Sequence, residues 1–168
     1  MNAMLRALTL VIIVSVGQAA VADDEEALVT FKVMKPAVAL ELAHAALEAC
    51  RQSGYQIAVA VVDRFGITQV ILRDQFAGAH TPETARRKAW TAVSFRTDTQ
   101  AMVEVTQAGQ PQSGVRFVEQ ALMIGGGVPV DAAGSMVGAV GVSGAPGGPI
   151  DHDCAVAGIE AVEEKLMF

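Results

Sequence analysis

The sequence contains little that would support familiar catalytic chemistry. It has only two cysteines and three histidines in 168 residues, and none of them stands in a CxxC, HExxH or Cys/His zinc spacing. Its glycine-rich stretches lack the Lys-Ser/Thr pair of a phosphate loop, the dinucleotide-binding spacing and the G-x-S-x-G of a serine hydrolase. The histidines, His44, His80 and His152, fall in different segments. This pattern favours a binding protein over an enzyme.

Basic residues are also scarce. Twelve lysines and arginines stand against 18 aspartates and glutamates, which gives a formal net charge of −6. An acidic chain without a basic stripe excludes nucleic acid as the expected partner.

The longest apolar run lies near the N-terminus and is too short for a membrane-spanning helix, which needs about 20 residues. Arg6 precedes the apolar residues 7–16, and Ala20-Val21-Ala22 follows as a small-x-small cleavage site. These features are typical of a secretory signal. We expect residues 1–22 to be a signal peptide and the protein to be periplasmic or secreted. An uncleaved membrane anchor is the alternative.

The remaining chain has the length of one domain. We expect an N-terminal segment at 23–35 and a folded domain at 36–168. Apolar periodicity predicts helices at 36–52, from Thr81 to about Arg96, and from Asp151 or Asp153 to about Leu166. Asp98 or Thr97 could cap a further, shorter helix that runs through Val105. Apolar runs predict strands at 55–63 and 67–73, with two or three more between 117 and 143. Short hairpin connections and strands that are apolar on both faces predict an α/β fold, a single-domain antiparallel sheet flanked by helices, of the profilin or PAS type.

The two cysteines, Cys50 and Cys154, fall in separate predicted helices. An exported protein meets oxidising conditions, so a disulfide is permitted. Both residues also fit helix faces as small buried apolar groups. We therefore expect them to remain unbonded.

The stretch from Asp74 to Arg96 is the richest in chemistry. It opens as a loop with Gly78 and His80, and Thr81 is a suitable N-cap for a helix whose first turn contains Pro82. An imidazole, a hydroxyl, an aromatic ring and three cations gather near this helix start; they belong to His80, Thr81, Phe76, Arg86, Arg87 and Lys88. Such a group suits an anionic, planar ligand that contains a metal. The alternative is a capped amphipathic helix with a solvated basic face.

A second polar run, Asp151-His152-Asp153-Cys154, could bind a metal ion. Adjacent residues at a helix start seldom point to one centre, however. We interpret Asp151 or Asp153 as a helix cap.

Four blocks of the sequence together resemble one family. They are AVAVVDRFG at 58–66, GAHTPETARRKAWTAVSFRT at 78–97, GGVPV at 126–130 and GAVGVSGAPGG at 138–148. In this order and spacing they resemble the GlcG/HbpS-like haem-binding family, which also includes the C-terminal domain of PduO-type proteins. The resemblance runs from about Pro36 to the C-terminus.

The resemblance implies a homo-oligomer that binds haem or a related tetrapyrrole. It makes His80 and Thr81 candidate residues on the iron side, with His80 as the expected axial ligand. Arg86, Arg87 and Lys88 match the basic helix start, where they could attract propionates. Phe76 and Trp90 could contact the macrocycle, although Trp90 fits a core position equally well.

The resemblance also implies a role in haem buffering, delivery or redox sensing, with a possible protein partner. Two alternatives stay open. One is an accessory subunit or small-molecule binder of a catabolic pathway that uses no haem. The other is weak haem-degrading activity.

Overall fold

The structure, a computed structural model, describes residues 28–167. The predicted signal peptide and its cleavage site lie outside the described residues. The chain divides into two compact units, Met1–Thr30 and Phe31–Phe168, and every described helix and strand belongs to the second. Within the described part, no helix is both long and apolar enough to cross a membrane.

A four-stranded antiparallel sheet forms the centre of the second unit. Its strands are β1 (Ala58–Asp63), β2 (Thr68–Arg73), β3 (Gly127–Ala132) and β4 (Ser135–Ser143), in the order β2-β1-β4-β3. β1 and β2 form the predicted hairpin, whose turn contains Gly66 at a φ of 81°. The antiparallel sheet predicted from the sequence is confirmed.

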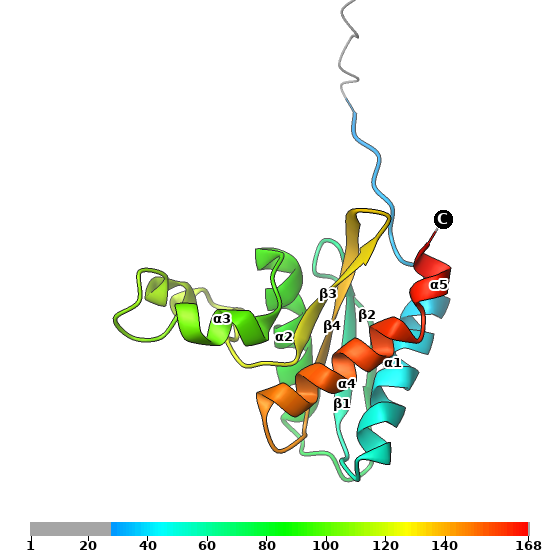
Figure 1. Ribbon diagram of the computed structural model, residues 1–168, viewed down its shortest axis with the longest axis horizontal. Coiled ribbons are helices and arrows are strands. Elements are labelled where there is room, and N and C mark those ends of the chain that lie inside the picture. The colour runs from blue at the N-terminus through cyan, green and yellow to red at the C-terminus, as the bar shows by residue number, and fades with distance from the viewer. Residues whose placement is uncertain (1–27, 168) are drawn as a thin grey trace, which may run out of the picture. The chain divides into compact units, whose positions relative to one another are not determined.

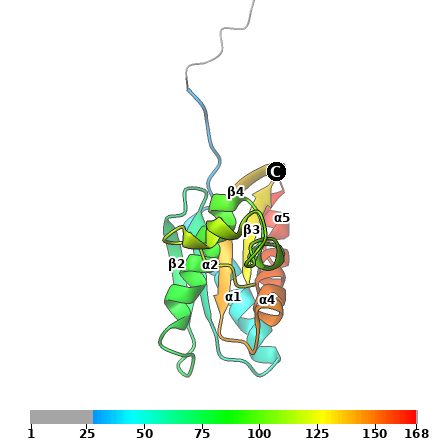
Figure 2. The same ribbon diagram turned by 90° about the vertical axis from the view of Figure 1, so that its left-hand side faces the viewer.

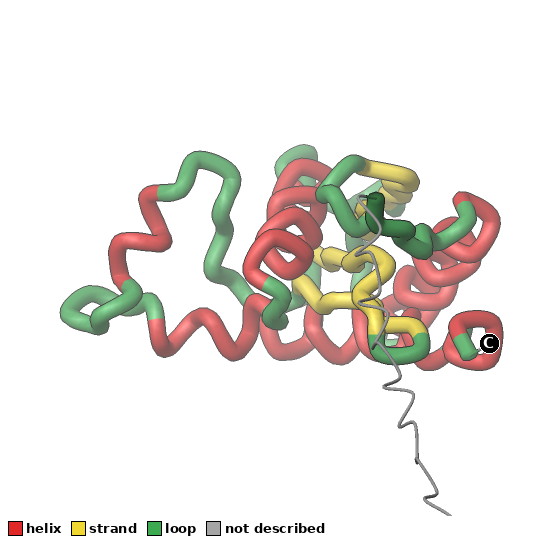
Figure 3. The backbone as a smooth tube through the Cα atoms, turned by 90° about the horizontal axis from the view of Figure 1, so that it is seen from above, coloured by secondary structure: helices red, strands yellow, loops and turns green. Residues whose placement is uncertain are grey.

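Helices cover both faces of this sheet. They are α1 (Pro36–Gln52), α2 (Thr81–Phe95), α3 (Thr99–Val105), α4 (Gly148–Glu160) and α5 (Glu163–Leu166), with a short 3-10 helix, η1 (Ser113–Phe117). α2 lies on one face, and α1 and α4 lie on the other (Figures 1 and 3). Seen from the α2 side, α3 and its neighbouring loops stand in front of the sheet (Figure 2).

The segment before β3 differs from the expectation of up to three strands between residues 117 and 143. Two strands form there, and residues 118–126 contain neither helix nor strand. Phe117 is 90% exposed, whereas Ala121 and Met123 of the same stretch are buried against Trp90 and Met102 without forming a strand. Apolar residues alone do not make a strand unless they pair with a neighbour.

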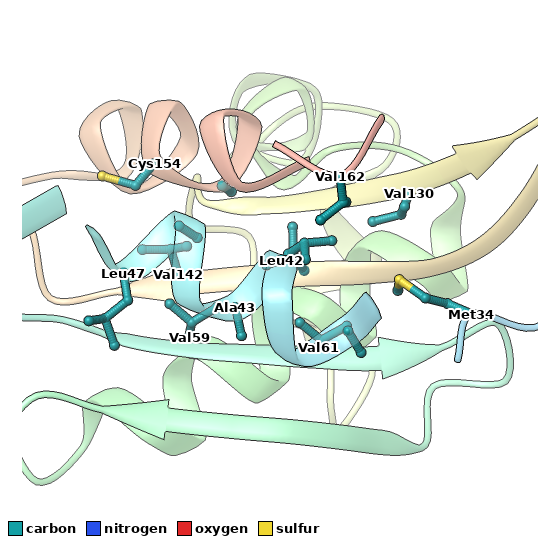
Figure 4. Packing of buried hydrophobic residues seen from close by; sticks show 14 of the residues in the cluster. Met34, Leu42, Ala43, Leu47, Val59, Val61, Val130, Val142, Cys154 and Val162 are labelled. Atoms are coloured by element: carbon teal, nitrogen blue, oxygen red, sulfur yellow. The ribbon is translucent and has the colours of Figure 1, made fainter. Parts of the chain in front are cut away.

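The face covered by α1 and α4 holds the main hydrophobic core. Leu42 and Leu47 of α1 pack there with Val59 and Val61 of β1 and Val142 of β4 (Figure 4). All five side chains are at most 3% exposed. This layer is filled by branched side chains, and Gly158 of α4 lets that helix approach α1 closely.

The expectation that the cysteines remain unbonded is wrong. Cys50 of α1 and Cys154 of α4 form a disulfide, with their Cα atoms 5.5 Å apart. Both cysteines are buried, as the helix faces predicted. The two helices pack side by side on one face, however, and that packing brings residues separated by 104 positions within bonding distance.

The opposite face is built from small residues. α2 packs on β1, β3 and β4 through Ala85, Ala89 and Ala92, all fully buried. A Cβ at Gly141 of β4 would overlap the carbonyl oxygen of Ala85 and would lie 2.7 Å from the backbone nitrogen of Ala89. Gly127 of β3 meets the backbone of α2 at Lys88 in the same way. The glycines therefore allow the helix backbone to rest directly on the strands.

Candidate functional site

Two loops meet at one end of the sheet and enclose a hollow. The register pairs Ala58 with both Arg73 and Ser143, so the loops that follow β2 and β4 leave the same end of the sheet, on either side of β1. The first leads into α2 and the second into α4 (Figure 1). The hollow between them has a volume of about 460 Å³, within the range of about 300 to 1,000 Å³ that is common for ligand pockets.

Four of the residues that the sequence singled out line this hollow. They are Phe76, His80, Thr81 and Lys88. The other wall is the stretch 143–148, together with Asp151 of α4. The candidate residues predicted from the sequence thus form one wall of the hollow, and none of them lies on the other wall.

His80 is the exposed imidazole at the rim. It stands immediately before α2, and its carbonyl accepts hydrogen bonds from the backbone and hydroxyl of Thr84. A Cβ at Gly78 would lie 2.7 Å from Cε1 and 2.9 Å from Nδ1 of the His80 ring. The imidazole thus occupies space that only a glycine leaves open, while its exposure leaves it accessible to a ligand.

Thr81 does not act as the predicted N-cap. α2 begins at Thr81 itself, and no side chain caps the helix. The Thr81 hydroxyl donates to the carbonyl of Gly78 at 2.8 Å, and the Thr81 backbone nitrogen donates to the same carbonyl at 3.0 Å. The tight turn through Gly78 takes up both donors and starts the helix one residue earlier than the sequence indicates.

Lys88 forms a buried ion pair beneath the hollow. Its side chain is 1% exposed, and Nζ donates to Oδ2 of Asp151 at 2.7 Å and to the carbonyl of Val142 at 2.9 Å. The other carboxylate oxygen of Asp151 accepts from the backbone nitrogen of Ala145 at 3.0 Å. The pair therefore joins α2, β4 and α4 and holds the glycine-rich loop in place.

Burial dominates the electrostatics of this pair. Desolvation lowers the pKa of Lys88 and raises the pKa of Asp151, because burial disfavours each charged form. The attraction between the two groups and their hydrogen bonds opposes both shifts. Lys88 therefore does not lie on the solvated basic face that the alternative interpretation of this helix expected.

The capping role expected of Asp151 is also wrong. α4 begins at Gly148, three residues earlier, with Pro149 in the first turn, where proline needs no N–H partner. Asp151 instead lies inside the first turn with its carboxylate buried. The exposed Asp153 lies further into the same helix.

Arg86 and Arg87 point away from the hollow. Arg86 pairs with Glu83 at 2.8 Å, and this guanidinium holds the pKa of Glu83 below its ordinary value. Arg87 donates to the backbone carbonyls of Glu119, Gln120 and Ala121. These arginines fasten the segment before β3 onto α2.

Of the two aromatic candidates, one lies at the hollow and the other lies in the core. Phe76 is 81% exposed beside the hollow. Trp90 packs against a small cluster formed by Met102, Ala121 and Met123, so it serves the core.

The residues of the second wall could not be recognised as site residues from the sequence. Residues 143–148 belong to one of the blocks that carry the family resemblance, but the glycines there gave no indication that the loop encloses a cavity. Asp151 is one of several acidic residues near a helix start, and only the buried Lys88 gives it a distinct role. No sequence pattern links two residues separated by 63 positions.

Among residues 28–167, no three histidine, cysteine, aspartate or glutamate side chains are placed to hold a metal ion. His80 could still supply one ligand to a metal that arrives inside a macrocycle, since such a metal needs only an axial group from the protein. The rim is therefore chemically suited to a haem iron, with His80 as the residue that would hold it and Phe76 as an adjacent apolar surface.

Comparisons with known proteins identify relatives that share this fold. A double mutant of HbpS from Streptomyces reticuli is 36% identical, with a TM-score of 0.75 over 86% of this chain and 97% of that one. The structure of a PduOC:haem complex is 29% identical, with a TM-score of 0.72 over 77% of this chain and 95% of that one.

The corrinoid adenosyltransferase PduO of Salmonella typhimurium is 32% identical over 119 residues. The match covers 70% of this chain but only 34% of PduO. The family model described as "Haem degrading protein HbpS-like" matches residues 34–160. This chain belongs to the HbpS-like family.

Proposed function

We propose that this protein binds haem, or a related tetrapyrrole, in the hollow between the start of α2 and the loop 143–148. Its family and the haem complex of a structural relative support the ligand class. The observation that carries the proposal is the exposed His80 imidazole at the rim of the hollow. Imidazole is a standard axial ligand of haem iron.

Neighbouring groups could contact the macrocycle and bind its propionates. The exposed ring of Phe76 would pack against the macrocycle and lose its contact with water. Arg86 and Arg87 are engaged elsewhere, and Lys88 is buried in its ion pair, so propionate binding falls to other groups. Backbone N–H groups at the start of α4, beside the glycine-rich loop, are suited to this role.

Haemin titration tests the proposal directly. The wild-type protein is expected to give a shifted Soret band with saturable binding. His80→Ala should change the band position and weaken binding at least ten-fold, while unfolding at the same urea concentration as the wild type. His44→Ala is the matched control, because His44 is also exposed but lies on α1.

The titration also separates the open alternatives. If His80→Ala leaves both spectrum and affinity unchanged while Thr81→Ala alters them, the axial ligand is Thr81. If the wild type shows no saturable Soret change, the protein is instead a small-molecule binder or accessory subunit that uses no haem.

Weak haem degradation is the second candidate function, and the description of the matching family favours it. It predicts a loss of the Soret band over time when ascorbate and oxygen are supplied, with release of iron to a chelator. The same band should persist when oxygen is excluded. A stable band under aerobic reduction would restrict the protein to haem buffering, delivery or sensing.

We also propose that the protein is exported to the periplasm or secreted, and that it forms a homo-oligomer. The disulfide between Cys50 and Cys154 supports export, because such bonds persist in oxidising compartments. Intact mass of the exported protein should show cleavage after Ala22, and light scattering should give a mass above that of one chain. Retention of residues 1–22, or a monomer mass, would contradict the respective claim.

A further inference from the structure

A second hollow lies at the opposite end of the sheet from His80. It has a volume of about 280 Å³ and is lined by the segment 32–35, the start of α1, the β3–β4 hairpin and α5. Its apolar lining includes Met34, Ala132, Val137 and Leu166, each at most 7% exposed. These four residues belong to the main hydrophobic core, so the hollow opens directly onto that core.

Lysines surround this apolar floor. The chain contains four lysines, and three of them, Lys32, Lys35 and Lys165, line the hollow. The fourth is the buried Lys88. The protein as a whole is acidic, with a net charge of −6, so this concentration of cations departs from the rest of the chain.

The lysines at this hollow differ in their ion-pair partners. Lys165 pairs with Glu41 of α1, and both side chains are about half exposed. Lys35 has no ion-pair partner among the residues that the structure describes. An arriving anion would therefore meet one uncompensated ammonium group beside others at the same opening.

The floor is also able to adapt. Met34 is an unbranched side chain that fills irregular gaps and tolerates changes in its neighbours. The backbone around it is held in place, because the Met34 carbonyl accepts a hydrogen bond from Gln69 of β2 at 2.9 Å. An apolar chain could therefore displace the Met34 side chain without breaking the hydrogen bond between the Met34 backbone and β2.

We propose that this hollow binds an anionic amphiphile with one short alkyl chain, such as a medium-chain carboxylate. The alkyl chain would enter the apolar floor, and the carboxylate would lie among the ammonium groups at the rim. The volume is slightly below the usual range for drug-sized ligands, which restricts the occupant to a small one. This site is independent of the proposed haem site.

Calorimetric titration with decanoate tests the proposal, with decanol and decyltrimethylammonium as matched probes of the same chain length. Decanoate should bind with one site per chain and more tightly than decanol, and the cationic probe should not bind. Each methylene added between hexanoate and decanoate should tighten binding about four-fold while the hollow can still bury it. Equal affinity for decanoate and decanol would overturn the assignment of the lysines.

Substitutions locate the site. Ala132→Leu fills the hollow and should abolish decanoate binding, while Lys35→Gln should weaken it several-fold. Arg96→Gln removes an exposed cation elsewhere and should have no effect. His80→Ala should also leave decanoate affinity unchanged, which distinguishes this hollow from the other.

Circular dichroism and urea unfolding must show that Ala132→Leu still folds. If it does not, Val38→Leu offers a milder filling of the same hollow. Decanoate binding that survives in the folded filling variant, or that disappears in His80→Ala, would refute the proposal.

Discussion

The two faces of the sheet are constructed in opposite ways. On the face covered by α1 and α4, branched side chains fill the space between backbones, and a disulfide joins the two helices. On the other face, α2 rests on the strands through alanines and glycines, with its backbone close to that of β4. Packing on the first face depends on large side chains that fill the space. Packing on the second face depends on small residues that let the backbones touch.

This difference explains where the proposed haem hollow lies. The backbone of α2 touches β4 so closely that even a methyl group added at Gly141 would overlap it. His80 at the start of that helix is therefore held relative to β4 and to the loop that follows it. The buried pair of Lys88 and Asp151 adds a polar connection between the same elements.

The largest expected effect comes from the disulfide on the α1–α4 face. Reduction of the bond between Cys50 and Cys154 should lower the free energy of unfolding by up to about 4.7 kcal/mol, because the closed loop is about 100 residues long. Urea denaturation with and without dithiothreitol measures the change. The Cys50→Ala/Cys154→Ala variant is the control and should show no response to the reductant. Equal unfolding midpoints for oxidised and reduced wild type would show that the α1–α4 packing holds this face without the bond.

The next effect should come from the ion pair on the α2 face. Lys88→Met leaves the buried carboxylate of Asp151 without its partner and should cost about 3 to 5 kcal/mol. The double variant Lys88→Met/Asp151→Leu should recover part of this loss, since neither charge then remains buried. Lys165→Met, at an exposed lysine, should change stability by about 0.5 kcal/mol or less. A small loss in Lys88→Met would indicate that the pair is dispensable and that backbone contact alone fixes α2.

A pair of opposite substitutions compares the faces directly. Gly141→Ala adds one carbon where the backbone of α2 cannot move away, and it should cost about 3 kcal/mol. Leu42→Ala deletes three carbons from the other face and should cost a similar amount, about 2 to 5 kcal/mol. Gly114→Ala, with no atom within 4 Å of the added carbon, is the control. If Gly141→Ala were as mild as this control, the account of the α2 face would be wrong.

Much of the fold could be predicted from periodicity. The bounds of α1 and β2 agree with the expected helix and strand, because each has a clear apolar pattern. α3 ends at Val105 as expected, and it begins directly after Asp98, whose side chain caps it. The disulfide could not be predicted, since it depends on how two helices pack across 104 residues of sequence. No local pattern reports that distance.

The candidate site shows a similar limit. Arg86, Arg87 and Lys88 are adjacent, and each successive side chain on a helix turns by about 100°. Which of them points inward depends on how α2 is rotated on the sheet. The glycines at positions 127 and 141 set that rotation through contacts that the sequence does not reveal. The sequence therefore identified a basic helix start but could not separate the buried lysine from the two surface arginines.

The smallest effect should come from the turn that leads into α2. Thr81→Val removes the hydroxyl that donates to the Gly78 carbonyl and should cost about 1 kcal/mol. The loss is small because the backbone nitrogen of Thr81 donates to the same carbonyl and remains in place. Thr81→Ser keeps the hydroxyl and should retain most of the stability, as measured by urea denaturation. A cost above about 3 kcal/mol in Thr81→Val would mean that this turn, and not the contact of α2 with the glycines, positions the start of the helix.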